Sequence, residues 1–344
     1  MALKILVDTL SHLSYISVNT ENTEITKKLT IFTAQRKDDM KVLVLGGNGF
    51  IGRNIVAKLQ AQSAQVVVGS RKLSLQNNQL QVKMHNMQQA EDWLLLINSF
   101  DIVVNAVGIL RERGLLNQRE TYANIHTLAV ESLADACALA GVKLIHISAI
   151  GLSSSAKSGF ITSKYWGEQA ILASGAEAII VRPSLLDGEG GYGAKWFRRV
   201  AAWPLQFVMQ CQGLVTPLQV ADLGEAVANL CLNPQTVPQI IELGGNNVMT
   251  VEQYLQTLRA SINKPNALQI NTPKWLVRLV SHVFDVLALT PLSYGHFLLM
   301  QGYNVPQLNM LPILLGRKPT GLGVKIEVRQ TAIDDLRVTC TPVN

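Results

Sequence analysis

The sequence has few cysteines, and none of them has a spacing that suggests a metal site or a disulfide. The four cysteines lie far apart in the 344 residues: Cys137, Cys211, Cys231 and Cys340. A zinc site or a redox pair needs closely spaced thiols such as C-x-x-C, so the spacing argues against both. A reducing compartment is the simpler inference. Cys137 and Cys231 fall on apolar helix faces, where we expect them to fill the core.

Charged residues are also scarce and form no long run. They make up 16% of the chain, and the formal net charge is +6. Scattered charges give nucleic-acid binding little support, although a weak attraction to anionic membrane surfaces or acidic partners stays open. No stretch of about 20 clean apolar residues marks a transmembrane helix. The nearest, Trp275 to Leu292, contains Arg278, His282 and Asp285. It predicts a buried amphipathic helix, with an interfacial helix as the alternative.

The first 39 residues lack the regular pattern of the rest of the chain. Asp8 and His12 interrupt the apolar core that a signal peptide needs, and acidic residues beside a single Arg36 are unlike a mitochondrial presequence. Met40 directly precedes the first apolar strand candidate. We therefore expect residues 1–39 to be a poorly ordered extension, or a wrongly assigned upstream segment, with Met40 as the functional start.

From Met40 onward, short apolar strands alternate with longer helices. The strand candidates are Lys41–Leu45, Gln65–Gly69, Leu80–His85, Asp101–Ala106, Lys143–Ser148, Ala178–Arg182 and Gln239–Leu243. Helical periodicity continues from the first strand to about Gln62 and covers about Arg119–Ala140, Phe160–Ser174 and Val220–Leu232. This alternation predicts an α/β protein with a Rossmann-type, doubly wound parallel sheet.

The alternation loosens after Arg182-Pro183, which predicts a second lobe. We expect residues 40–250 to form a dinucleotide-binding domain and residues 251–330 a smaller, mostly helical C-terminal lobe. Residues 184–215 would contribute to that lobe, which would cover the carboxyl ends of the strands, where such folds bind ligands. Residues 331–344 look like a tail. Four aromatic residues either line a pocket there or pack the lobe: Trp196, Phe197, Trp203 and Phe207.

The glycine-rich run GGNGFIGR links the first strand candidate to the first helix. Gly46 permits a tight turn, Gly49 lets the backbone approach a pyrophosphate, and Gly52 lets the helix pack close to the strand. The first helical residues, Phe50 and Ile51, carry unpaired N–H groups at the positive end of the helix dipole. The run therefore predicts a dinucleotide site, and an ordinary glycine-rich turn is the alternative.

The end of the second strand bears on the choice of cofactor. A carboxylate there would hold the ribose hydroxyls of NAD and repel a 2′-phosphate, but the sequence has Ser70, Arg71 and Lys72 instead. Arg71 can pair with the phosphate and Ser70 can donate a hydrogen bond, with Arg53 helping from the other side. We therefore expect NADP(H) rather than NAD(H). The alternative is that Arg71 and Lys72 are solvated loop charges.

Two further strand ends carry candidate cofactor contacts. Ala106, Val107 and Gly108 follow the fourth strand, and small residues there let the chain pass beneath the cofactor ribose. A plain strand-to-loop turn is the alternative. Asn86, after the third strand, stands where an adenine contact is expected.

Several motifs add up to a family resemblance. Besides the glycine-rich run they are Ser148, Ser163-Lys164, Gly167-Glu168, Arg182-Pro183 and Val220-Ala221-Asp222. The chain thereby resembles the extended and atypical short-chain dehydrogenase/reductases from Met40 to about residue 250. The resemblance implies that Lys164 holds the nicotinamide ribose, that Ser148 orients a carbonyl, and that Pro183 lies at the cofactor.

The family's catalytic tyrosine falls on Phe160 in this chain. The tyrosine and lysine of that family stand four residues apart, so both lie on one helix face. A phenyl ring keeps the packing but loses the proton, and general acid–base catalysis is typically worth about 10² to 10⁴-fold. Tyr165 is turned by about 100° from Lys164 and is no obvious rescue. His146, inside a strand, is expected to be a satisfied structural histidine.

A narrower resemblance covers short motifs of the second half. They are Thr216–Asp222, Leu287–Leu292, Tyr303-Asn304-Val305 and Gly316–Gly323. They resemble the NADPH-holding accessory subunits of mitochondrial respiratory complex I and their bacterial relatives. The resemblance implies a cofactor-holding accessory, assembly or sensor protein of a respiratory or quinone-related complex, cytoplasmic and peripheral at the inner face of a membrane. The alternative is an active atypical NAD(P)-dependent reductase, epimerase or dehydratase acting on a small carbonyl or sugar-nucleotide substrate.

Overall fold

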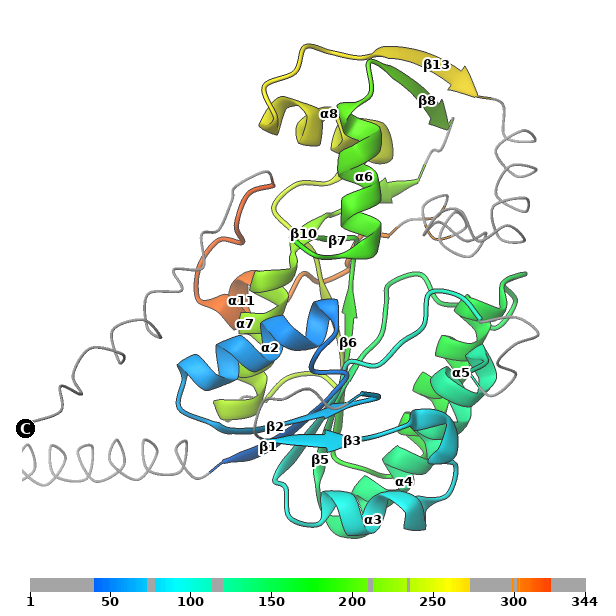
Figure 1. Ribbon diagram of the computed structural model, residues 1–344, viewed down its shortest axis with the longest axis vertical. Helices are drawn as coiled ribbons and strands as arrows, with labels where there is room; N and C mark the ends of the chain where they lie inside the picture. The colour runs from blue at the N-terminus through cyan, green and yellow to red at the C-terminus, as the bar shows by residue number, and fades with distance from the viewer. Residues whose placement is uncertain are drawn as a thin grey trace, which may run out of the picture.

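A seven-stranded, fully parallel sheet with helices on both faces forms the centre of the molecule (Figure 1). The computed structural model describes residues 40–72, 78–112, 120–209, 213–233, 236–272, 299, 302 and 304–322. The strand order is β11-β6-β5-β4-β1-β2-β3. This order confirms the predicted doubly wound α/β fold. It reverses between β1 and β4, so the crevice for a ligand lies at their carboxyl ends.

The strand predictions hold within one residue at each end, with one exception. The strands are β1 (Lys41–Leu45), β2 (Gln65–Ser70), β3 (Gln79–Gln81), β4 (Ile102–Asn105), β5 (Lys143–Ile147), β6 (Ala178–Pro183) and β11 (Ile240–Leu243). The third strand prediction is wrong beyond Gln81, because Met84–Asn86 is a 3₁₀ helix, η1. The partner strand β2 ends at Ser70, whose carbonyl accepts the Val82 N–H at 2.9 Å, and the ladder stops there.

Alternate strand residues feed two apolar cores, one on each face. Val42 and Val44 face a core that includes the helices α2 (Phe50–Ala61), α7 (Val220–Leu232) and α11 (Leu311–Leu315). Leu43 and Leu45 face the opposite core, which is covered by α3 (Ala90–Ile97), α4 (Ala129–Ala140) and α5 (Gly159–Ala173). Strands that are buried on both faces read as continuous apolar runs, which is why β1 is recognisable in the sequence.

The long helix expected over about Arg119–Ala140 begins differently from the prediction. Residues Ala123–Leu128 form a π-helix, η3, which runs directly into α4. The His126 carbonyl lies so close to α5 that a Cβ on Gly167 would come within 2.0 Å of its oxygen. Only a glycine permits this approach, so η3 and α5 are held in close contact beside the ends of β4 and β5.

A third apolar cluster lies outside the sheet. It is built mainly from α6 (Tyr192–Ala202) and α8 (Val251–Ser261). Short strand pairs accompany it: β7 (Leu186–Asp187) with β10 (Leu218–Gln219), β9 (Leu214–Val215) with β12 (Met249–Thr250), and β8 (Leu205–Met209) with β13 (Leu268–Thr272). The two helices come from the two segments for which the sequence predicts a second lobe.

Hydrogen bonds tie this region to the sheet. The Ser184 hydroxyl accepts from the Thr216 N–H at 3.0 Å and donates to the Asn304 carbonyl at 2.6 Å. Within the part of the chain that the structure describes, no helix is both long and apolar enough to cross a membrane. The segments 1–39, 275–292 and 331–344, for each of which the sequence makes a prediction, lie outside the described residues.

Candidate dinucleotide site

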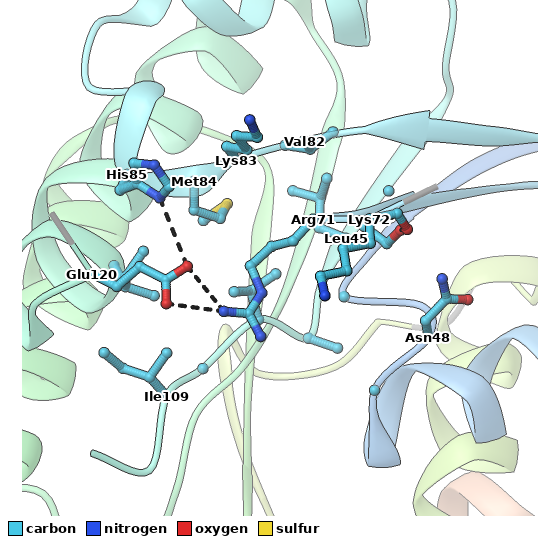
Figure 2. A pocket seen from close by; sticks show the side chains of 18 of the residues that line it. Leu45, Asn48, Arg71, Lys72, Val82, Lys83, Met84, His85, Ile109 and Glu120 are labelled. Atoms are coloured by element: carbon cyan, nitrogen blue, oxygen red, sulfur yellow. Dashed lines mark hydrogen bonds and ion pairs between the residues drawn. The ribbon is translucent and has the colours of Figure 1, made fainter. Parts of the chain in front are cut away.

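A cavity of about 760 Å³ opens at the carboxyl ends of β1, β2 and β4 (Figure 2). Seven of the predicted cofactor residues line it: Gly46, Gly49, Ser70, Arg71, Ala106, Val107 and Gly108. Residues that the sequence did not single out line it too, among them Asn48, Met84, His85 and Glu120. The cavity stands where the strand order reverses, which is the usual ligand position in such sheets.

The glycine-rich turn is shaped by close backbone contacts. Gly46 has φ +74° and donates its N–H to the Gly69 carbonyl at 2.7 Å. The Gly49 N–H donates to the Gly46 carbonyl at 2.8 Å. A Cβ on Gly52 would lie 2.2 Å from that same oxygen, so α2 starts directly against the turn. The N-cap residue of α2, Gly49, lines the cavity, so the positive end of the helix dipole lies at the edge of the cavity.

Arg53 is placed away from the cavity lining. Its guanidinium donates to the Glu189 carbonyl and lies 5.8 Å from the centre of the Phe50 ring. Gly190 and Gly191 pass so close that a Cβ on either would collide with Arg53 or Phe50. A contact between Arg53 and a bound phosphate thus requires this side chain to leave its carbonyl partner.

Arg71 reaches across the cavity to a buried carboxylate. Its Nη1 lies 2.9 Å from both carboxylate oxygens of Glu120, and His85 Nδ1 stands 4.0 Å from one of them (Figure 2). The Ser70 hydroxyl donates to the Lys72 carbonyl at 2.6 Å. Asn86, predicted to contact adenine, is exposed and does not line the cavity, whereas the preceding Met84 and His85 do.

Lys164 lies at the other end of the site, beside Gly108. A Cβ on Gly108 would lie 3.8 Å from Lys164 Nζ. The lysine is almost fully buried, and this burial lowers its pKa to about 8, although the Glu168 carboxylate one turn further along α5 favours the charged form. Glu168 is itself paired with Arg182, whose Nε lies 3.0 Å from a carboxylate oxygen. The Lys164 ammonium is thus held by its helix next to the chain that leaves β4.

His126 is a buried neighbour of Lys164 that the sequence prediction missed. Its Nε2 accepts the Ile109 N–H at 3.0 Å, and its Nδ1 lies 3.1 Å from the Ser163 hydroxyl. Because Nε2 accepts, the ring proton resides on Nδ1. Burial, and then the Lys164 charge, lower the His126 pKa well below its usual value, so the ring is neutral. His126 thereby fastens the loop after β4 to α5.

Phe160 packs into this aromatic group. Its ring centre lies 5.6 Å from that of His126 and 5.8 Å from that of Tyr122, and Lys164 Nζ lies 6.0 Å from it. The face of α5 that carries Lys164 therefore presents a phenyl ring with no proton to exchange. Tyr165, one residue beyond, packs instead against the exposed Trp166.

Two buried polar side chains at the end of β5, Ser148 and His146, differ in whether they have a hydrogen-bond partner. The Ser148 hydroxyl is buried and has no hydrogen-bond partner among the described residues. His146 has one, because its Nδ1 lies 3.2 Å from the Asn105 amide, and burial lowers the His146 pKa to about 3. A buried hydroxyl without a partner is costly, so Ser148 suits a site in which a ligand supplies the missing partner. Pro183 lies at the end of β6, and its carbonyl accepts the Ile150 N–H at 3.2 Å.

Comparisons with known proteins agree with this geometry. Residues 42–204 match the model of the NAD dependent epimerase/dehydratase family. The matched segment is 163 of the 344 residues, a little under half of the chain. A solved structure, "MoeE5 in complex with UDP-glucose and NAD", has a similar fold and superimposes on this chain with a TM-score of 0.58. It is 16% identical and covers 82% of this chain and 95% of its own, so it supports the fold alone.

The curated relatives include proteins named as subunits of NADH dehydrogenase and a protein named as a reductase. The chain is 26% identical to "NADH dehydrogenase [ubiquinone] 1 alpha subcomplex subunit 9, mitochondrial" of Dictyostelium discoideum over 72% of this chain and 71% of that one. Against the mouse protein of that name the identity is also 26%, over 59% of this chain and only 56% of the relative. A "Ceramide reductase" of Caulobacter vibrioides is 23% identical over 56% of this chain and 61% of its own. The family resemblance predicted from the sequence is confirmed.

Proposed function

We propose that this protein binds NADP(H) and holds it, rather than turning it over rapidly. The observation that carries the proposal is the combination of a well-formed dinucleotide cavity with Phe160 in place of an acidic hydroxyl beside Lys164. A cofactor held there can supply a hydride, but α5 offers no proton at position 160. Loss of a general acid typically costs about 10² to 10⁴-fold in rate.

The residues present fit a phosphorylated dinucleotide. The glycine turn and the start of α2 provide backbone N–H groups for a pyrophosphate. Arg71 supplies a cation at the end of β2, where an extra phosphate would lie, and Lys72 and Lys83 also line the cavity. At the far end, the Lys164 ammonium and the unpartnered Ser148 hydroxyl would bind the ribose and the ring substituent.

An accessory, assembly or sensor role in a respiratory or quinone-related complex is the finer part of the proposal. It is supported by the similarity to the proteins of Dictyostelium and mouse that are named as subunits of NADH dehydrogenase. Such a role places the protein at the inner face of a membrane, as a peripheral component. It requires a bound nucleotide but no turnover.

The direct test is to purify the protein, release any bound nucleotide and identify it by mass. We expect NADP⁺ or NADPH, retained through gel filtration, and no steady reduction of carbonyl or sugar-nucleotide substrates. Rapid steady turnover by the natural sequence would reject the holding role, and absence of any nucleotide binding would reject the proposal altogether. Phe160→Tyr should raise a trace activity if the rest of the pocket is competent. Phe197→Tyr, a buried substitution of the same kind in α6, is the matched control.

A second candidate function is an active reductase that works without the tyrosine. It is favoured by the buried Ser148 hydroxyl and the low pKa of Lys164, which together could position a water as proton donor, and by the similarity to the ceramide reductase. The two functions differ in one measurement. An active reductase consumes NADPH steadily with a carbonyl substrate, and Lys164→Met abolishes that consumption.

A further inference from the structure

The cavity contains a carboxylate that the sequence around β2 does not predict. Rossmann-type proteins that prefer NAD carry an acidic residue at the end of the second strand, whereas this chain has none there. The structure brings Glu120 to that position from a segment 49 residues further along the chain. Figure 2 shows its side chain and that of Arg71 pointing toward each other across the cavity.

Glu120 is the fixed partner of this pair. Its side chain is only 7% exposed, whereas that of Arg71 is 54% exposed. A buried carboxylate cannot give up its counter-charge without a large cost, so Arg71 stays on Glu120 when no ligand competes. Arg71 contacts Glu120 through Nη1, so its Nη2 and Nε are the donors that could bind a phosphate.

A phosphate on those two nitrogens lies one guanidinium group away from the Glu120 carboxylate. That separation is shorter than the Debye length of about 8 Å at physiological ionic strength, so the two anions repel each other. The same carboxylate has no such conflict with a 2′-hydroxyl, which is uncharged and can donate a hydrogen bond to it.

We propose that Glu120 is a specificity-determining residue that reduces the preference of this site for NADP(H) over NAD(H). This inference rests on the proposed function, because it concerns the same cavity. Glu120 partly neutralises Arg71 and repels the added phosphate. The site therefore binds both dinucleotides with affinities within about one order of magnitude of each other, which corresponds to a difference in binding free energy of about 1.4 kcal/mol.

The test is Glu120→Gln, which removes the charge but keeps a carbonyl oxygen for Arg71 Nη1. Dissociation constants for NADPH and NADH are measured by quenching of protein fluorescence. We expect the affinity for NADPH to rise about tenfold and that for NADH to change less than about twofold. Glu91→Gln, an exposed acid on α3 that does not line the cavity, is the control for net charge and should leave both constants unchanged.

The outcomes separate the two proposals. If the natural sequence binds neither nucleotide, the proposed function fails. If it binds nucleotide and Glu120→Gln leaves the NADPH to NADH ratio unchanged, or shifts it toward NADH, the inference is overturned. Glu120→Ala serves if the glutamine variant does not fold. Should both fail to fold, Glu120→Asp decides, because its shorter side chain withdraws the carboxylate from Arg71, so the preference for NADPH over NADH must rise, and an unchanged ratio overturns the inference.

Discussion

A methyl group at position 52 should force apart the first turn of α2 and the end of β1. The Cβ of an alanine there would lie 2.2 Å from the Gly46 oxygen and 2.7 Å from the Gly47 Cα, where ordinary contact begins at 3.4 Å. Both neighbours are backbone atoms, so no side chain can rotate away. The helix must retreat by about 1 Å, and it takes its N–H groups with it.

The magnitude is set by two opposing effects. Overpacking of this kind costs about 1–3 kcal/mol of unfolding free energy, and the upper part of that range applies because the clash involves only backbone. Alanine recovers up to about 1 kcal/mol through its higher helix propensity. We therefore expect Gly52→Ala to lose about 1–2 kcal/mol in urea unfolding and to bind NADPH about tenfold or more weakly.

Gly193→Ala is the matched control for Gly52→Ala. Gly193 is also a helical glycine, but a Cβ there has no neighbour within 4 Å. It should therefore be neutral, or more stable by up to about 1 kcal/mol, with unchanged nucleotide binding. If Gly52→Ala matched Gly193→Ala in both unfolding free energy and affinity, the close turn would not be what forms the cradle.

Three further predictions concern ionisable groups. Burial lowers the Lys164 pKa from 10.5 to about 8, so the unfolded chain binds more protons between those values and the unfolding free energy should rise with pH across that window. Lys164→Met should flatten that rise, which is at most roughly 3 kcal/mol. The His146 pKa falls from 6.5 to about 3, so stability should decrease as the pH drops below 6.5, and less steeply in His146→Gln, as followed by urea titration at each pH. Asp222 is 1% exposed and accepts from Arg317 Nη2 and the Thr320 hydroxyl, both at 2.9 Å. Arg317→Ala leaves this buried carboxylate without its counter-charge and should cost about 3 kcal/mol, whereas Asp222→Asn also removes the buried charge and should cost less. A larger loss of unfolding free energy for Asp222→Asn than for Arg317→Ala would contradict this reasoning.

The parts of the fold that the sequence predicts well are those set by local pattern. Lys41–Leu45 and Val220–Leu232 match their predicted bounds, because burial leaves a continuous apolar run in the strand and closely spaced apolar residues over thirteen positions in the helix. The prediction for the third strand extends too far, to His85, because the end of that strand depends on where the neighbouring β2 stops, which no local pattern contains.

The candidate site divides in the same way. The glycine turn and the β4 end are contiguous motifs, and the cavity is found at them. Glu120 and His126 were missed because each acts on residues distant in the chain: Glu120 on Arg71, and His126 on Ile109 and Ser163. Their only local signal is a polar residue at a position that turns out to be buried. The π-helix that positions His126 likewise reflects its contact with α5 rather than its own composition.

The hydrogen bonds of the Ser184 hydroxyl limit how the chain can be divided into fragments that fold. A single hydroxyl joins three segments of the sequence, since Thr216 lies 32 residues and Asn304 120 residues beyond it. Closing so long a loop is entropically unfavourable until the rest of the chain has folded, so we expect the hydrogen bonds of Ser184 to form last. A fragment ending near residue 250 would lack Asn304, so the Ser184 hydroxyl would lose its hydrogen-bond acceptor. The region around α6 and α8 therefore depends on the sheet and is not a module that can be moved to another protein.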